Sequence, residues 1–283
     1  MRVDAHHHLW HPVRGDYGWM PPGDPVLDRP YGPSDLAPML AARGIDATIL
    51  VQAAPTVAET EYMLGLADAV PWVAGVVGWV NFEDPSARAT LERLARHPRF
   101  KGVRPMIQDI ADPDWMLRHD VAWGFEAVAA LDLTFDALGF ARHLDNFHAI
   151  LTRHPMRAVI DHAMKPDIEG GGLDDWAAGM ARLARDTDAR VKLSGLVTEA
   201  GAGWTIEALR PVAGHLFETF GPARIMWGSD WPVCRLRAEY GEWLDAAEAL
   251  TEELTADERA MVFGGTAAAF YRIGGGAAEA RAS

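Results

Sequence analysis

The feature that most constrains the fold of this chain is its alternation of short apolar runs with longer amphipathic stretches. Eight strand-like runs rich in β-branched and apolar residues are Arg2–His6, Ala47–Gln52, Val73–Val80, Phe100–Arg104, Leu133–Leu138, Arg157–His162, Arg190–Ser194 and Arg224–Gly228. Helix-like stretches follow them at Ser34–Arg43, Val57–Ala69, Pro85–His97, Val121–Leu131, Arg142–His154, Leu173–Thr187, Ile206–Phe220, Glu239–Glu253 and Ala256–Tyr271. Such alternation predicts an α/β fold, and eight units in 283 residues favour one closed (β/α)8 TIM barrel over a doubly wound sheet.

The connections between these segments differ in length according to their direction. Those from helix to strand are short, as at Gly44–Asp46, whereas the first strand-to-helix connection, His7–Pro33, is long and holds six prolines. In a barrel all strand-to-helix connections open at the C-terminal ends of the strands, where catalytic groups lie. We therefore expect an active site at that end of a barrel domain spanning 1–273. A Gly/Ala-rich tail, 274–283, is expected to be flexible.

The composition narrows the classes of partner. A net charge of -14 disfavours nucleic acids and anionic membranes, both of which need basic surface. The single cysteine, Cys234, excludes an intrachain disulfide and a cysteine-based zinc site. No apolar run approaches the ~18 residues of a membrane span, and the strand that begins at Arg2 leaves no room for a signal peptide. We expect a cytoplasmic protein with a small-molecule substrate; homo-oligomerisation is left open.

The segment Asp4-Ala5-His6-His7-His8 is the most informative for function. Strand alternation predicts that Asp4, His6 and His8 face the barrel lumen, while Ala5 and His7 face the helices. Two imidazoles at positions i and i+2 of a rigid strand end can bind one divalent metal ion.

Two further groups are predicted at the same end of the barrel. Asp230 leaves an apolar strand within Gly-Ser-Asp, where its carboxylate could activate a water molecule, and His162 ends the sixth strand.

Six segments in this order resemble the amidohydrolase superfamily, whose first strand ends in His-x-His and whose eighth supplies an aspartate. They are Asp4–Trp10, Tyr17–Trp19, Lys101–Asp109, Asp161–Pro166, Lys192–Glu199 and Gly228–Cys234. More narrowly, the chain resembles the sugar-lactonase branch of amidohydrolase family 2, which includes L-fuconolactonase-like and L-rhamnonolactonase-like enzymes. The resemblance implies an amidohydrolase-like barrel that hydrolyses a sugar-acid lactone. All three lysines, Lys101, Lys165 and Lys192, fall within these segments.

The resemblance also implies a metal site, with His6, His8, His162 and Asp230 as candidate ligands. The predicted fifth strand has no histidine and only Asp136, so we do not expect a two-metal site. One divalent ion, with zinc as first choice, and a metal-independent site both remain open.

For lactone hydrolysis, Asp230 is the candidate general base, and His162 and Arg104 are further catalytic candidates that could stabilise the oxyanion together with His6, His8 or a metal ion. Candidate substrate-binding residues are Gln52, Gln108, Lys165, Trp19 and Trp231. Structural roles for Gln52 and Lys165 are equally open, and packing within its own loop is the alternative to a substrate contact for Trp19. Pro105 stands where many members of this branch have a histidine, which puts one substrate contact in doubt.

Three alternatives have to be weighed against a sugar lactonase. They are a metal-dependent decarboxylase of an aromatic or muconate-type acid, a hydrolase of a dicarboxylate lactone, and a catalytically silent binding barrel. A substrate with carboxylates calls for several arginines, and Arg104 is the one predicted to face the lumen. The pattern therefore favours a neutral polyol lactone.

Overall fold

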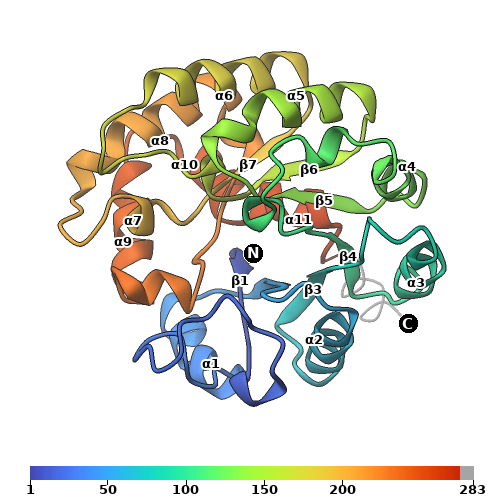
Figure 1. Ribbon diagram of the computed structural model, residues 1–283. Helices are drawn as coiled ribbons and strands as arrows, with labels where there is room; N and C mark the ends of the chain where they lie inside the picture. Colours follow the sequence, from blue (N-terminus) through green and yellow to red (C-terminus); the bar gives the residue numbers. More distant parts are fainter. Residues whose placement is uncertain (275–283) are drawn as a thin grey trace, which may run out of the picture.

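The computed structural model describes residues 1–274 and forms a barrel of eight parallel strands in sequential order. The strands are β1 Val3–His7, β2 Ala47–Val51, β3 Val73–Gly78, β4 Phe100–Val103, β5 Thr134–Ala137, β6 Arg157–Ile160, β7 Arg190–Leu193 and β8 Ile225–Trp227. Backbone hydrogen bonds from Asp230 N to His6 O (2.8 Å) and from His8 N to Trp231 O (2.7 Å) join β1 to the segment after β8 and close the barrel. The predicted single (β/α)8 barrel is confirmed (Figure 1).

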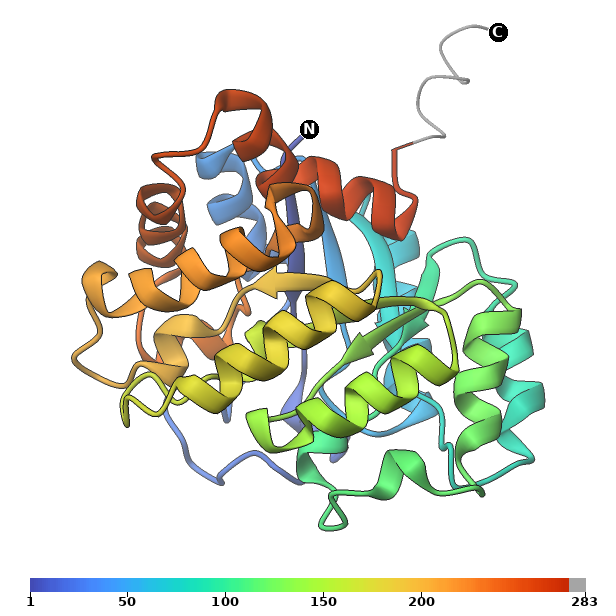
Figure 2. The same cartoon turned by 90° about the horizontal axis from the view of Figure 1, so that it is seen from above.

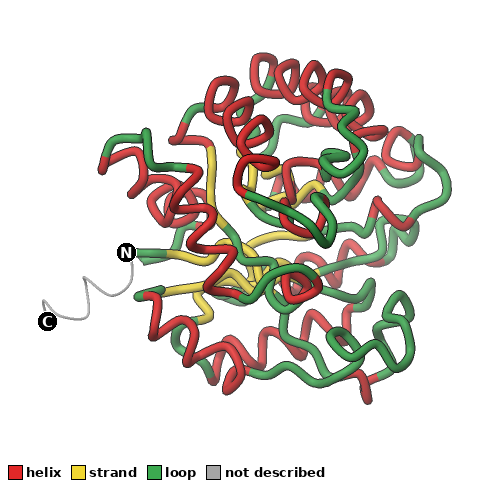
Figure 3. Tube along the Cα trace, turned by 90° about the vertical axis from the view of Figure 1, so that its left-hand side faces the viewer, coloured by secondary structure: helices red, strands yellow, loops and turns green. Residues whose placement is uncertain are grey.

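Helices surround the strands in a ring (Figures 1 and 3). They are α1 Pro33–Arg43, α2 Val57–Ala69, α3 Ala87–Leu94, α4 Ala122–Ala130, α5 Leu144–Arg153, α6 Asp174–Asp186, α7 Leu196–Glu199, α8 Ile206–Phe220, α9 Tyr240–Leu250, α10 Ala256–Ala260 and α11 Thr266–Tyr271. The predicted last helix is broken into α10 and α11 by non-helical backbone at Gly264. Sequence periodicity missed α7, because its four residues are too short to show a helical repeat.

The N-terminal half of the barrel lumen is filled by apolar side chains. Val3, Ala5, Ile49, Val77 and their neighbours on other strands form one buried cluster with residues of α11. Figure 2 shows α11 lying across the end of the barrel at which the N-terminus enters. The lumen is thus closed at that end, and only the C-terminal end can hold a site.

A β-bulge in β1 changes the predicted direction of Asp4. Asp4 pairs with Thr48 and His7 pairs with Leu50, so β1 has one residue more than β2 between these two pairs. Asp4 consequently faces α9, where its Oδ2 accepts a hydrogen bond from the Tyr240 hydroxyl (3.2 Å). The predictions that Asp4 shares the lumen with His6 and His8 and that Ala5 faces the helices were both wrong, because strict alternation does not continue through a bulge.

Some predictions on chain organisation are only partly addressed by the structure. No helix within residues 1–274 is both long enough and apolar enough to cross a membrane. In the predicted tail, 274–283, residues 275–283 lie outside the described residues. The division between barrel domain and tail at Ile273 therefore stays a prediction.

Candidate active site

A cavity of about 150 Å³ opens at the C-terminal ends of the strands. Its wall is formed by His8, Trp10, Trp19, Ala53, Arg104, Met106, Gln108, Leu138, His162, Lys165, Asp230 and Val233. Seven of the candidates named from sequence are in this wall, and His6 lies directly beneath it, within 3.3 Å of the His8 ring. The long strand-to-helix connections do build a pocket, as expected for this end of a barrel.

Three imidazoles converge on one carboxylate oxygen at the base of the cavity. The Nε2 atoms of His8, His6 and His162 lie 3.3, 3.7 and 3.9 Å from Asp230 Oδ1. Burial lowers the pKa of His6 well below its usual value and that of His162 to about 4, so these rings are neutral at pH 7. Burial opposes ionisation of Asp230, but the adjacent imidazoles outweigh it and lower its pKa, so Asp230 is charged.

Hydrogen bonds at the far side of two rings direct their Nε2 atoms inward. His8 Nδ1 donates to the Val51 carbonyl (2.8 Å), which leaves the lone pair of a neutral ring on Nε2. His162 Nδ1 lies 2.9 Å from Ser194 Oγ.

This donor set fits a divalent ion. Around a tetrahedral zinc with bonds of about 2.0–2.1 Å, neighbouring ligand atoms are about 3.4 Å apart. The separation between His6 Nε2 and His8 Nε2 is 3.3 Å, and His6, His8 and Asp230 can all offer one atom to a common centre.

The backbone that carries these groups is strained. His162, Ala163, Met164 and Lys165 form a turn with φ between 49° and 59°, and Asp230 has φ 55°. A left-handed conformation costs a non-glycine residue roughly 1–2 kcal/mol. Trp176 Nε1 donates to the Ala163 carbonyl (2.7 Å) and holds the turn, which brings both His162 and Lys165 to the cavity wall.

Gly195 is required beside this turn. It has φ +69°, and a Cβ built there would lie 2.8 Å from His162 Nδ1. Any larger residue would therefore be strained itself and would displace the His162 ring.

Gln52 and Trp231 do not line the cavity in the described structure, unlike the other predicted substrate contacts. Gln52 Nε2 donates to the Arg104 carbonyl (2.8 Å), and the Arg104 guanidinium donates back to the Gln52 carbonyl and to Oε1. Gln52 therefore orients Arg104. Trp231 is buried with its ring edge against Tyr31, because the chain turns outward after Asp230.

The remaining substrate candidates lie at the rim. Lys165 Nζ donates to Gln108 Oε1 (2.6 Å), which links two loops across the wall. Trp19 is 38% exposed, and its Nε1 donates to the Ala53 carbonyl (2.6 Å). Pro105 faces a neighbouring depression and leaves this part of the wall to Met106.

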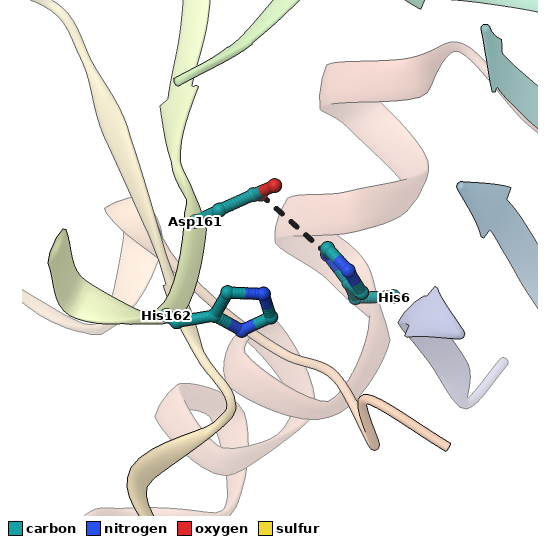
Figure 4. Close-up of side chains that lie close together, drawn as sticks. All are labelled: His6, Asp161 and His162. Carbon is teal, nitrogen blue, oxygen red and sulfur yellow. Dashed lines mark ion pairs between the residues drawn. The ribbon is translucent and has the colours of Figure 1, made fainter. Parts of the chain in front are cut away.

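Sequence reasoning assigned no role to three buried ionic residues beneath the cavity. Lys192 Nζ lies 2.5 Å from Asp136 Oδ2, 2.9 Å from Asp161 Oδ1 and 3.1 Å from His6 Nδ1. Figure 4 shows Asp161 pointing at the His6 ring, 3.5 Å from Nδ1. The signals available were the rarity of lysine and the position of Asp161 next to His162 in one of the family-like segments.

The two aspartates respond differently to burial. Burial raises the pKa of Asp136, and Lys192 only partly offsets this. For Asp161 the effect of burial is outweighed by Lys192 and His6, so its pKa lies well below the usual range. Arg104 Nη1 lies 3.2 Å from Asp161 Oδ2 and adds to this stabilisation.

The barrel and its imidazole–aspartate site are those expected of an amidohydrolase. A family model described as Amidohydrolase matches residues 3–273. The chain belongs to this amidohydrolase family, which confirms the resemblance seen in the sequence. It is 43% identical over 277 residues to the L-fucono-1,5-lactonase of Burkholderia ambifaria, with 96% of both chains covered. It is 38% identical to the L-fucono-1,5-lactonase of Burkholderia multivorans, again with 96% of both covered. A crystal structure of an amidohydrolase from Burkholderia multivorans with bound zinc superposes with a TM-score of 0.90 at 37% identity, covering 97% of this chain and 100% of the other.

Proposed function

We propose that this enzyme hydrolyses a small, neutral sugar-acid lactone of the L-fucono-1,5-lactone or L-rhamnonolactone type. The observation that carries the proposal is the charged Asp230, enclosed by three imidazoles at the base of a small cavity. The near full-length similarity to two L-fucono-1,5-lactonases supports the same substrate class.

In the proposed mechanism Asp230 accepts a proton from the attacking water as the water oxygen bonds to the lactone carbonyl carbon. The carbonyl oxygen becomes negatively charged, and Arg104 in the wall contributes positive charge next to it. When the bond from the carbonyl carbon to the ring oxygen breaks, Asp230 returns the proton to that oxygen. The product is the open-chain hydroxy acid. His162, held by Ser194 and Gly195, orients the lactone carbonyl.

We propose that His6, His8 and Asp230 hold one divalent ion, with zinc as the expected metal; His162, the fourth ligand predicted from the sequence, groups instead with His6 and Asp161. The support is the ligand spacing described above and the zinc bound by the structurally similar amidohydrolase from Burkholderia multivorans. Such an ion would act as a Lewis acid toward the lactone carbonyl.

The cationic groups of the wall favour a neutral substrate over a dicarboxylate. Arg104 is already paired with Asp161, and Lys165 donates to Gln108. Little cationic capacity is therefore left for two carboxylates. Trp10 and Trp19 supply an aromatic wall, and Gln108 and Lys165 supply polar groups for sugar hydroxyls.

The single cysteine is consistent with a cytoplasmic setting, which we propose for this enzyme.

The test is a pH-indicator assay on metal-analysed protein, with and without prior chelation. L-fucono-1,5-lactone and L-rhamnonolactone are compared with a dicarboxylate lactone, and a hydroxybenzoate is followed for CO2 release. We expect acid release from the neutral lactones and restoration by zinc of any activity lost on chelation. Faster turnover of the dicarboxylate lactone, or CO2 from the aromatic acid, would overturn the proposal.

A further inference from the structure

We infer that the Lys192 ammonium is a built-in cation that occupies the inner part of the site and excludes a second metal ion. Two donor groups share His6: one is His6, His8 and Asp230, and the other is His6, Asp161 and His162. By ligand type alone, each could bind a divalent ion. We call the first the outer group and the second the inner group. Because Lys192 lies against Asp161 and His6, only the outer group is available to a metal ion.

The position of Lys192 is that of a cation surrounded by ligands. Its Nζ contacts Asp136 Oδ2, Asp161 Oδ1 and His6 Nδ1 at 2.5, 2.9 and 3.1 Å, and its side chain is 0% exposed. Tyr271, from α11, donates its hydroxyl to Asp136 Oδ2 (2.7 Å) and fixes that carboxylate from below. Two carboxylate oxygens and one imidazole nitrogen thus surround the ammonium, from β5, from the residue after β6 and from β1.

Asp161 depends on this ammonium. Its Oδ1 is fully buried and receives no aligned hydrogen bond from any described residue, so the Lys192 ion pair is its closest neutralising contact. Asp161 Oδ2 is paired with Arg104. Removal of the Lys192 amine would leave buried carboxylate oxygens that must take up either a proton or another cation.

The charge balance leaves no place for a second divalent ion in the presence of Lys192. Asp136 and Asp161 carry two negative charges, and Lys192 and Arg104 carry two positive charges. A divalent ion added here would be an unneutralised buried charge. The His6 ring separates the two regions, since Nδ1 faces Lys192 while Nε2 faces His8 and Asp230.

The experiment is to count zinc ions in the Lys192→Ala variant and the wild type, equilibrated at the same free zinc concentration and analysed for metal after dialysis. We expect one more zinc ion per chain in the variant than in the wild type. We also expect zinc to raise the melting temperature of the variant more than that of the wild type. Lys101→Ala, at a half-buried lysine of β4 outside the site, is the matched control and should bind as the wild type does.

A second variant tests the position of the added ion. Lys192→Ala combined with Asp136→Asn removes one carboxylate, and we expect it to lose the extra zinc ion. A folded Lys192→Ala protein with no more zinc than the wild type would overturn the inference. Two ions per wild-type chain would also overturn it, and this measurement does not depend on the variant folding.

The inference rests on the proposed function only through the outer metal site. A wild type without zinc beside a variant with one ion would contradict the proposed outer site while supporting the built-in cation.

Discussion

In the N-terminal half of the barrel lumen, side chains such as Val3, Ile49 and Val77 pack against α11, whereas in the C-terminal half the same strands carry histidines, aspartates, Lys192 and Arg104. The change occurs within one or two residues along the chain: Val159 on β6 belongs to the apolar cluster, and Asp161, just after the end of β6, belongs to the ionic one. The site is therefore a short extension of a stable barrel.

The two halves contribute differently to stability. The C-terminal half contains buried charges and five non-glycine residues in left-handed backbone, all of which cost free energy. The buried apolar cluster that includes Val3, Ile49 and Val77 has neither feature and supplies packing. We therefore expect substitutions in the C-terminal half of the lumen to change activity, and substitutions in the N-terminal half to change stability.

The largest effect is expected at Asp230. Asp230→Asn removes the proton acceptor and should lower kcat for the lactone by about 10³-fold or more, while the melting temperature changes little. Lactone turnover and thermal unfolding measure the two quantities. Asp245→Asn, at an exposed carboxylate of α9, is the control and should retain activity. A nearly active Asp230→Asn enzyme would remove the general base from the mechanism.

The opposite result is expected in the apolar half. Ile49→Ala leaves a cavity in the closed part of the lumen and should lower the free energy of unfolding by about 3 kcal/mol, and Ile49→Val by about 1 kcal/mol. Urea denaturation gives these values. We expect kcat of both folded variants to remain at the wild-type value, and a strong loss of kcat would show that the two halves are coupled.

A smaller effect is expected at the rim of the cavity. Trp19→Ala removes part of the aromatic wall and should raise KM roughly tenfold, about 1.4 kcal/mol, with kcat nearly unchanged. Steady-state kinetics separate the two constants. Val13→Ala, in the same connection but 84% exposed, is the matched control. An unchanged KM would indicate that Trp19 serves only its own loop.

The last effect concerns the pH dependence of stability. Glu59 accepts hydrogen bonds from the Ala53 and Ala54 amides beside the cavity, and burial raises its pKa from 4.5 to about 7. Its folded pKa is the higher one, so its contribution to stability is complete below pH 4.5 and is lost as pH rises toward 7. Glu59→Gln should flatten this dependence, by at most about 1.4 kcal/mol per pH unit, the slope for one proton.

The measurement is the free energy of unfolding at several pH values for wild type and variant. Glu61→Gln, at an exposed position of the same helix, should leave the profile unchanged. If the free energy of unfolding depends on pH in the same way for Glu59→Gln and wild type, Glu59 has the same pKa in the folded and unfolded protein, which would contradict the prediction.

Much of this molecule could be predicted from local patterns. Strand and helix periodicity identified the barrel and the end that carries the site, and the segment around His6 and His8 pointed to the family that residues 3–273 match. These patterns succeed because each element has a repeat of its own. Asp4, Gln52 and Trp231 are different, since their directions depend on a bulge and on how neighbouring loops pack.

The sequence by itself determined the order of the elements, the family, and the set of histidines and aspartates at the C-terminal end of the barrel. Only the tertiary structure decided which of them meet. Lys192 and His6 are 186 residues apart in the chain, and no sequence periodicity indicates that both contact Asp161. Their contact arises because closure of the barrel brings β1, β5, β6 and β7 around one buried volume, in which each charge must find an opposite charge.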